Sequence, residues 1–153
     1  MIPAALFAIL AIARVGAIHA VVFGGFAPAS LAQRIEASKP RLIVTASCGI
    51  EGAKGPMSYK PFIESALEKS KHKPSGVLIW QREQLRWDAI SDSKGERDWK
   101  YLVEKAKAKG SRAECVPVNS DDGLYIIYTS GRRHYYFPLL SSRANMVRHH
   151  GYT

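Results

Sequence analysis

Tyr125-Ile126-Ile127-Tyr128-Thr129-Ser130-Gly131 is a run of four β-prone residues that leads directly into a small polar corner. The apolar half is typical of a buried strand, and the corner offers hydroxyls and backbone N–H groups that can surround a phosphate. A strand that ends in Ser-Gly is more often an ordinary turn, so this stretch alone is a weak signal. Its meaning depends on the segments upstream.

Upstream of this stretch, short apolar runs alternate with helical patterns. We predict buried strands at residues 20–23, 41–46 and 76–80, and helices at 4–18, from Pro28 to about Lys39, from Pro61 to about Lys71, and from the Asp98 cap to Gly110. Such alternation predicts an α/β fold, a partial doubly wound parallel sheet with flanking helices. Residues 47–59 and 81–97 are expected to be loop or irregular, and Asp121-Asp122-Gly123 a turn.

Ligands of such sheets bind beyond the carboxyl ends of the strands. Three predicted loops occupy that position: residues 24–26, 47–54 and 129–131. The first two are therefore candidate binding loops together with the Thr-Ser-Gly corner.

The first twelve residues are apolar, yet they lack the basic region of a signal peptide, and Arg14 interrupts the run before it is long enough to span a membrane. We interpret this segment as a core helix packed on both sides, at the start of a chain that has lost its beginning.

The formal charge of +9 is uneven, because residues 132–153 carry four arginines and no acid, which leaves +5 for residues 1–131. This weakens a nucleic-acid interpretation of the whole chain. Cys48 and Cys115 lie far apart without further ligand types nearby. We expect two reduced, partly buried thiols, a cytoplasmic or mitochondrial-matrix setting, and no targeting segment in this chain.

Four segments together carry a family resemblance: residues 1–3, 13–19, 21–26 and 125–131. They resemble the short-chain acyl-CoA synthetases, the acetyl- and propionyl-CoA synthetase branch of the AMP-forming, adenylate-forming ligases. The likeness covers residues 1–131, and residues 45–51 and 80–83 are closer to the propionyl-type subgroup.

The resemblance implies a reaction in which a short carboxylic acid, ATP and coenzyme A give acyl-CoA, AMP and pyrophosphate, with an acyl-adenylate between two steps. It implies ATP, coenzyme A and Mg²⁺ as cofactors and partners, because phosphoryl chemistry depends on positioning and charge neutralisation. The residues that match the opening of the ATP phosphate loop are Thr129, Ser130 and Gly131. The residues placed at the coenzyme A end are Gly24, Gly25, Glu51, Gly52, Ala53 and Lys54.

Residues 132–153 depart from the family, because bulky Arg132 to Phe137 stand where small residues are expected and cannot readily adopt positive φ. We expect a basic, disordered tail outside the family, derived from a shifted reading frame or a retained intron. The chain is then an interior piece of a ligase N-terminal domain, with unpaired sheet edges and a core helix that lacks its cover. We assign no catalytic and no metal-binding residue, and the acyl chain length stays open.

Three functions remain. The first is an acid–CoA ligase fragment that is inactive alone. The second is a module that still binds coenzyme A or an adenine nucleotide through residues 47–54 and 129–131. The third, which we disfavour, is a binder of nucleic acid or acidic surfaces that uses the arginines and aromatic residues of the tail: Arg132, Arg133, Arg143, Arg148, Tyr135, Tyr136 and Phe137.

Overall fold

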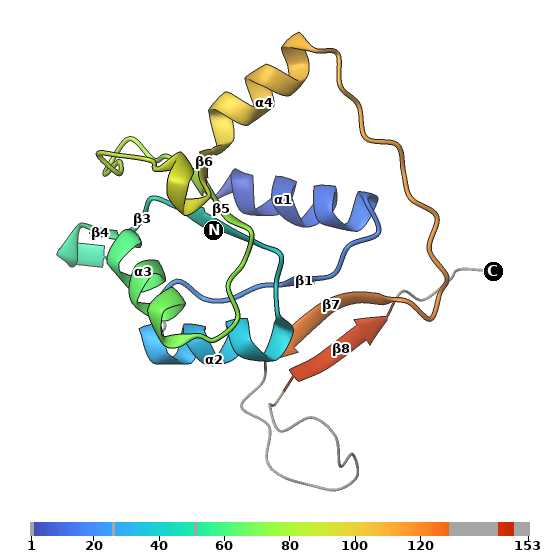
Figure 1. Cartoon of the computed structure of the whole chain (residues 1–153), viewed down its shortest axis with the longest axis horizontal. Coiled ribbons are helices and arrows are strands. Elements are labelled where there is room, and N and C mark those ends of the chain that lie inside the picture. The colour runs from blue at the N-terminus through green and yellow to red at the C-terminus, as the bar shows by residue number, and fades with distance from the viewer. Residues whose placement is uncertain (1, 26, 51, 129–143, 149–153) are drawn as a thin grey trace, which may run out of the picture. The chain divides into compact units, whose positions relative to one another are not determined.

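Figure 1 shows a computed structural model of the chain, which describes residues 2–25, 27–50, 52–128 and 144–148. The chain divides into two units, which are described separately. One unit is Phe23–Arg112, and the other combines Met1–Val22 with Ala113–Thr153.

The larger unit contains a three-stranded parallel sheet in the order β2-β5-β6. Its strands are β2 (Leu42–Ala46), β5 (Gly76–Trp80) and β6 (Glu96–Asp98). All five residues of β2 pair with β5, from Leu42 opposite Gly76 to Ala46 opposite Trp80. The helix between β2 and β5 makes the crossover that a parallel pair requires.

Three helices flank this sheet: α2 (Pro28–Ser38), α3 (Lys60–Lys69) and α4 (Trp99–Ala108). Because side chains alternate along a strand, one face of β5 carries Val77 and Ile79, which pack with Ile63 of α3. Trp80 belongs to the other face, where its ring meets Trp99 of α4 edge-on at 5.8 Å. Helices on both faces confirm the predicted parallel α/β class with flanking helices.

The helix ends follow the sequence signals closely. Pro28 lies in the first turn of α2, and the Asp98 Oδ1 accepts a hydrogen bond from the Tyr101 N–H at 2.8 Å at the start of α4. α4 ends at Gly110 with φ 63°, and the Ser111 N–H returns to the Ala106 carbonyl at 3.0 Å. This is the pairing of a Schellman motif, for which glycine is favoured.

The smaller unit contains α1 (Pro3–Arg14), β1 (His19–Ala20), β7 (Gly123–Tyr128) and β8 (Ala144–Arg148). β1 is parallel to β7, with His19 opposite Tyr125, and β8 is antiparallel to β7. Gly16 ends α1 with φ 67°, and the Val116 N–H donates to the Arg14 carbonyl at 2.9 Å.

Several detailed expectations are wrong. The strand expected at 20–23 is the pair His19–Ala20, and Val21 and Phe23 are 64% and 74% exposed. The loop expected at 47–59 contains a hairpin, and the stretch 81–97 ends in β6. The parallel strands are divided between two sheets.

The N-terminal helix is also more exposed than predicted. Only Ala4 and Ala8 of α1 are buried, so it is not a helix packed on both sides.

Cys48 is buried as expected, whereas Cys115 is exposed. Part of the tail expected to be disordered, Ala144–Arg148, forms β8, and residues 132–143 and 149–153 lie outside the described residues. None of the described helices has the length and apolar character needed to cross a membrane.

Candidate cofactor-binding loops

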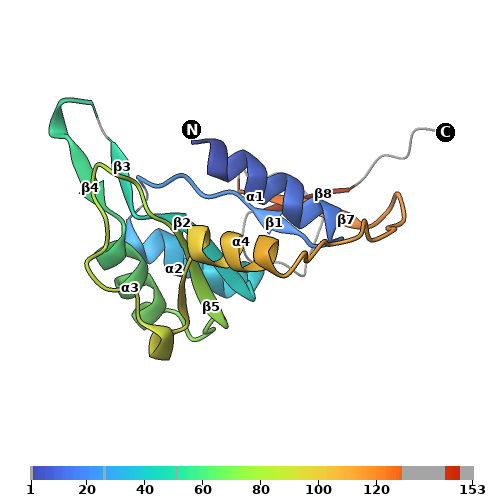
Figure 2. The same ribbon diagram turned by 90° about the horizontal axis from the view of Figure 1, so that it is seen from above.

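The predicted coenzyme A loop forms the end of a hairpin in the larger unit. β3 (Cys48–Ile50) pairs antiparallel with β4 (Pro56–Ser58), and a single 3₁₀ turn, Gly52–Lys54, joins them. Figure 2 shows this hairpin reaching away from α2 and α3. Gly52, Ala53 and Lys54 are all exposed, while Glu51 lies outside the described residues.

Two glycines of this hairpin end have left-handed backbone conformations and open space around them. Gly52 and Gly55 have φ of 46° and 73°, a region that side-chain-bearing residues rarely adopt. A Cβ added at either glycine would meet no atom within 4 Å. Gly52–Lys54 is therefore an open, exposed stretch of backbone that carries the Lys54 side chain.

The root of the hairpin is fixed by Ser47, which is fully buried. Its Oγ donates to the Leu85 carbonyl at 2.7 Å and accepts from the Arg82 N–H at 2.8 Å. Its carbonyl accepts from the Trp87 Nε1–H at 2.8 Å and from the Tyr59 N–H at 3.0 Å. One serine therefore ties the segment 82–87 to the end of β2.

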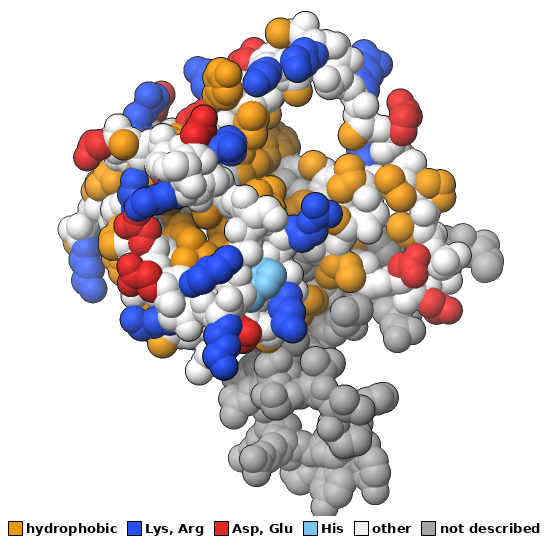
Figure 3. Space-filling model, in the orientation of Figure 1, with side chains coloured by type: hydrophobic (Ala, Val, Ile, Leu, Met, Phe, Trp, Pro, Cys, Tyr) orange, Lys and Arg blue, Asp and Glu red, His pale blue; other side chains and the backbone are white. Residues whose placement is uncertain are grey.

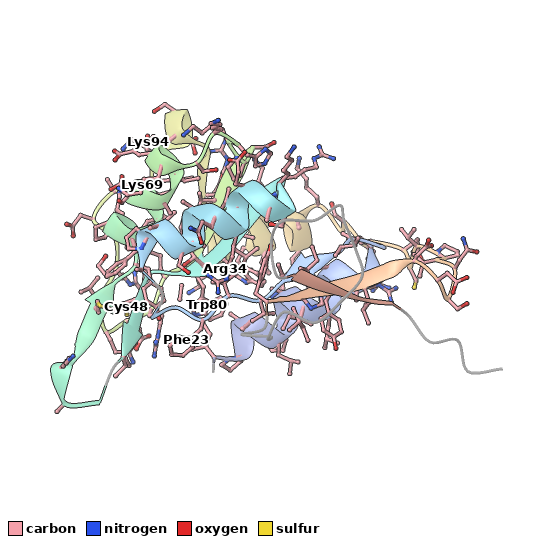
Figure 4. The ribbon with its side chains drawn as sticks, turned by 90° about the horizontal axis from the view of Figure 1, so that it is seen from below. Phe23, Arg34, Cys48, Lys69, Trp80 and Lys94 are labelled. Atoms are coloured by element: carbon pink, nitrogen blue, oxygen red, sulfur yellow. The ribbon has the colours of Figure 1, made fainter. Side chains whose placement is uncertain are left out.

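Arg82 adds a further bond at the same place, because its guanidinium donates to the Cys48 carbonyl at 3.2 Å. Figure 4 labels Cys48 on β3, at the start of the hairpin, and Trp80 at the end of β5. Gln81 exchanges hydrogen bonds with the Trp87 main chain at 3.0 and 3.3 Å. The carboxyl edge of β2 and β5 thus carries a closed polar network.

Lys60 is a nearby cation that is already engaged. Its Nζ donates to the Ala89 carbonyl at 2.8 Å, lies 4.0 Å from a Glu96 carboxylate oxygen and lies 5.3 Å from the centre of the Trp87 ring. Glu96 is buried, and its carboxylate accepts from the Ser91 N–H at 2.8 Å. Lys60 therefore fixes this edge, and Lys54 is the cation that the hairpin presents to solvent.

Gly24 and Gly25 form an exposed turn, and the structure gives Gly24 a neighbour that the sequence did not suggest. An added Cβ at Gly24 would overlap the Tyr59 hydroxyl, and the same holds for Gly49 in β3. The small size of Gly24 is thus required by Tyr59. The predicted approach of a cofactor to this turn stays a prediction.

The predicted phosphate-loop residues Thr129, Ser130 and Gly131 lie outside the described residues, but the strand that leads to them is described. The His19 ring stacks on Tyr125 at 5.6 Å, beside an open depression of about 270 Å³ that β7 lines with His19 and Val21. Burial lowers the pKa of His19, and its Nδ1 has no hydrogen-bond partner among the described residues.

The structure therefore brings the Gly24 turn and the hairpin root together around Tyr59. Sequence reasoning included Ser47 only as the first residue of the candidate binding loop 47–54, and it assigned no role to Tyr59 or Arg82. The signal for two of them was present, since residues 45–51 and 80–83 were recognised as family-like segments. Tyr59 carried no signal, because its role depends on contacts with residues 10 and 35 positions away.

Other candidate ligands find less support. Within the described ranges, no three His, Cys, Asp or Glu side chains are grouped to hold a metal ion, so no residue is assigned to Mg²⁺. On the face drawn in Figure 3, Lys and Arg side chains are interspersed with Asp and Glu. The basic residues 132, 133 and 143 proposed for nucleic-acid binding lie outside the described part, and no side chain is described for Arg148.

Comparison with known proteins identifies the family to which the chain belongs. The profile of the family described as AMP-binding enzyme matches residues 1–131. The chain is 46% identical over 131 residues to human "Acyl-CoA synthetase short-chain family member 3, mitochondrial", covering 86% of this chain and 18% of that protein. It is 38% identical over 135 residues to the acetyl-coenzyme A synthetase of Leptospira biflexa, covering 86% and 20%.

A solved structure agrees on the fold. The crystal structure of Brucella canis acyl-CoA synthetase matches 96% of this chain and 21% of that chain, with a TM-score of 0.63 at 22% identity. The chain thus spans about a fifth of the length of the relatives it matches. With its profile match across residues 1–131, the chain belongs to the AMP-binding enzyme family, in which it is similar to part of the short-chain acyl-CoA synthetases.

Proposed function

We propose that this chain supplies coenzyme A- and adenine nucleotide-contacting loops of an acid–CoA ligase. The reaction converts a short carboxylic acid, ATP and coenzyme A into acyl-CoA, AMP and pyrophosphate. The observation that carries the proposal is the exposed hairpin end Gly52–Lys54, with open space at Gly52 and an exposed Lys54 side chain, in a chain that matches the family over residues 1–131.

Each loop has a limited task in this proposal. The Lys54 ammonium and the backbone N–H groups around Gly52 attract the phosphates of coenzyme A, and Glu51 is the acidic residue of the same segment, residues 51–54. Thr129, Ser130 and Gly131 follow β7 and contact the ATP phosphates. Bound nucleotide with Mg²⁺ supplies charge neutralisation at the phosphoryl group.

We further propose that the chain does not turn over by itself. Its relatives are about five times longer, and adenylate formation depends on several groups preorganised around one cleft. The measurement is acid-dependent exchange of labelled pyrophosphate into ATP by the purified chain, with acetate and propionate as acids. Exchange at background level is expected, and exchange above background would contradict the proposal.

The second candidate is retained binding without catalysis. The exposed Lys54 favours it, and the incomplete surroundings of the hairpin predict weak affinity. Calorimetric titration with coenzyme A tests this, because Lys54→Met should abolish most of the signal. The matched control is Lys73→Met, an exposed lysine of the same unit, which should leave the signal unchanged. A titration signal that is unchanged in Lys54→Met would contradict the proposal that the hairpin end binds coenzyme A.

The mitochondrial names of several relatives make the mitochondrial matrix one proposed setting, beside the cytoplasm. Cys48 and Cys115 as free thiols agree with either compartment.

A further inference from the structure

Tyr59 is the common neighbour of two glycines in different segments, Gly24 in an exposed turn and Gly49 in strand β3. A Cβ added at Gly24 would lie 2.5 Å from the Tyr59 Cζ, and one added at Gly49 would lie 2.7 Å from it, with the hydroxyl closer in both cases. Real Cβ atoms essentially never approach another atom below 3.0 Å. The Gly24 turn and strand β3 therefore both approach the Tyr59 phenol so closely that only glycine fits at positions 24 and 49.

Neither glycine is required by its own backbone conformation. Gly24 and Gly49 do not have the positive φ found at Gly52 and Gly55. Space, and not a left-handed conformation, is thus the reason for glycine at these two positions.

Hydrogen bonds of the Tyr59 main chain and packing of its ring both fix the position of Tyr59. The Tyr59 N–H donates to the Ser47 carbonyl, and the Tyr59 carbonyl accepts from the Ile63 N–H in the first turn of α3, both at 3.0 Å. The ring packs against the buried cluster that contains Ile63, Val77, Ile79 and Trp87. A phenol has only two side-chain torsions, so a ring anchored in this way is a stiff spacer.

We infer that Tyr59 is a positioning residue: it sets the spacing between the Gly24 turn and the hairpin root, and thereby orients the hairpin end for coenzyme A. The second half of this inference rests on the proposed function of Gly52–Lys54. The first half stands on the contacts of Gly24 and Gly49 alone.

The experiment combines Gly24→Ala with substitutions of Tyr59 and follows backbone hydrogen exchange of the whole chain by mass spectrometry. Gly24→Ala is expected to raise exchange in residues 48–58 by about tenfold, because the added methyl displaces the ring from the hairpin. Tyr59→Leu in the same chain should reduce that increase several-fold, and Tyr59→Phe should reduce it less, since the Cζ clash remains.

Tyr101→Leu serves as the matched control, because Tyr101 is 62% exposed on α4 of the same unit. It should leave the effect of Gly24→Ala unchanged. An effect of Gly24→Ala that is equally large with and without Tyr59→Leu would overturn the inference.

Titration with coenzyme A tests the second half of the inference, the orientation of the hairpin end for coenzyme A, separately from the first. Tyr59→Leu is expected to weaken coenzyme A binding by about tenfold, whereas Tyr101→Leu should not change it. Equal binding by Tyr59→Leu and the unsubstituted chain would overturn the positioning role toward the cofactor. Absence of binding by the unsubstituted chain would contradict the retained-binding candidate, and hydrogen exchange would still decide whether Tyr59 sets the spacing of the hairpin root.

Discussion

Ser47 is the residue on which the candidate site depends most directly, because its single buried hydroxyl bonds two main-chain groups of the segment 82–87. Its Oγ bonds both the Leu85 carbonyl and the Arg82 N–H, and no solvent reaches it. Removing the hydroxyl takes away the donor to the carbonyl of half-buried Leu85 and the acceptor for the N–H of half-buried Arg82.

We predict that Ser47→Ala lowers the free energy of unfolding by about 1–3 kcal/mol, because the two hydrogen bonds of the hydroxyl are lost. Urea denaturation followed by tryptophan fluorescence measures the change, since Trp87 belongs to the same network. The control is Ser93→Ala, an exposed serine, which should stay within roughly 0.5 kcal/mol. A Ser47→Ala value as small as that of the control would contradict the importance of the network.

Glu36 provides a pH-dependent contact between α2 and the end of α3. Its Oε2 accepts from the His72 N–H, the Ser70 hydroxyl and the Lys71 N–H, each at 3.0 Å. The backbone hydrogen bond from His72 is the largest cause that lowers the pKa of Glu36 below its ordinary value, followed by the bond from Ser70. Because the folded pKa is the lower one, the stabilisation is present above the ordinary pKa and is lost as pH falls through the folded pKa.

Glu36→Gln is therefore expected to lower Tm at pH 7, and the difference from the unsubstituted chain should shrink as pH falls below about 4.5. Circular dichroism melts between pH 3 and pH 7 measure it. Glu104→Gln, which removes an exposed carboxylate paired with Lys107, should show a small difference at every pH. A Glu36→Gln difference that does not vary with pH would contradict the assigned role.

At the scale of elements, α4 shows how one side chain begins a helix. Asp98 accepts from the Tyr101 N–H, while no residue of α4 is buried, so the cap contributes a large part of the local stability. Asp98→Ala should cost about 1 kcal/mol and Asp98→Asn much less, because asparagine caps nearly as well. Thermal unfolding monitored by circular dichroism distinguishes the two, and equal losses would show that the negative charge, not the hydrogen bond, stabilises this end.

The helices and the two long strands of the larger unit could be predicted from the sequence, because their signals are local. Pro28, Asp98 and Gly110 mark ends that the structure confirms to within a residue or two. The strand β6 could not be predicted, since Glu-Arg-Asp has low strand propensity. β6 forms because it pairs with the free side of β5. Next to this pairing, Gly76 of β5 approaches the Gly95 carbonyl so closely that an added Cβ would lie 2.8 Å from the oxygen.

The candidate site was predictable only in outline, for the same reason. Lys54 and Gly52 were identified from a family-like segment, and the structure adds that they lie at the end of a hairpin. The reason for glycine at position 24 depends on Tyr59, and the reason for Ser47 depends on residues 35 to 40 positions later. Such contacts are set by tertiary structure, and a single sequence carries no local pattern for them.

At the scale of the whole molecule, the exposed apolar residues of α1 require an explanation. Leu6, Phe7 and Leu10 are each more than half exposed, at 51%, 55% and 59%, on a helix whose buried residues are two alanines. A soluble domain rarely leaves a contiguous apolar helix face in water, because such a face promotes association. We therefore expect the isolated chain to self-associate and to bind the dye ANS.

The test is the double substitution Leu6→Lys with Leu10→Lys, because lysine retains helix propensity and adds charge to the exposed face. Sedimentation velocity should then show less association and ANS fluorescence should fall, while the helical circular dichroism signal is kept. Tyr101→Lys, a single exposed aromatic residue on α4, should leave both readings unchanged, since an isolated apolar side chain does not form a patch. If the α1 substitutions had no effect on either reading, association would have to arise elsewhere, and the exposed strand edges of the two sheets would be the next surfaces to examine.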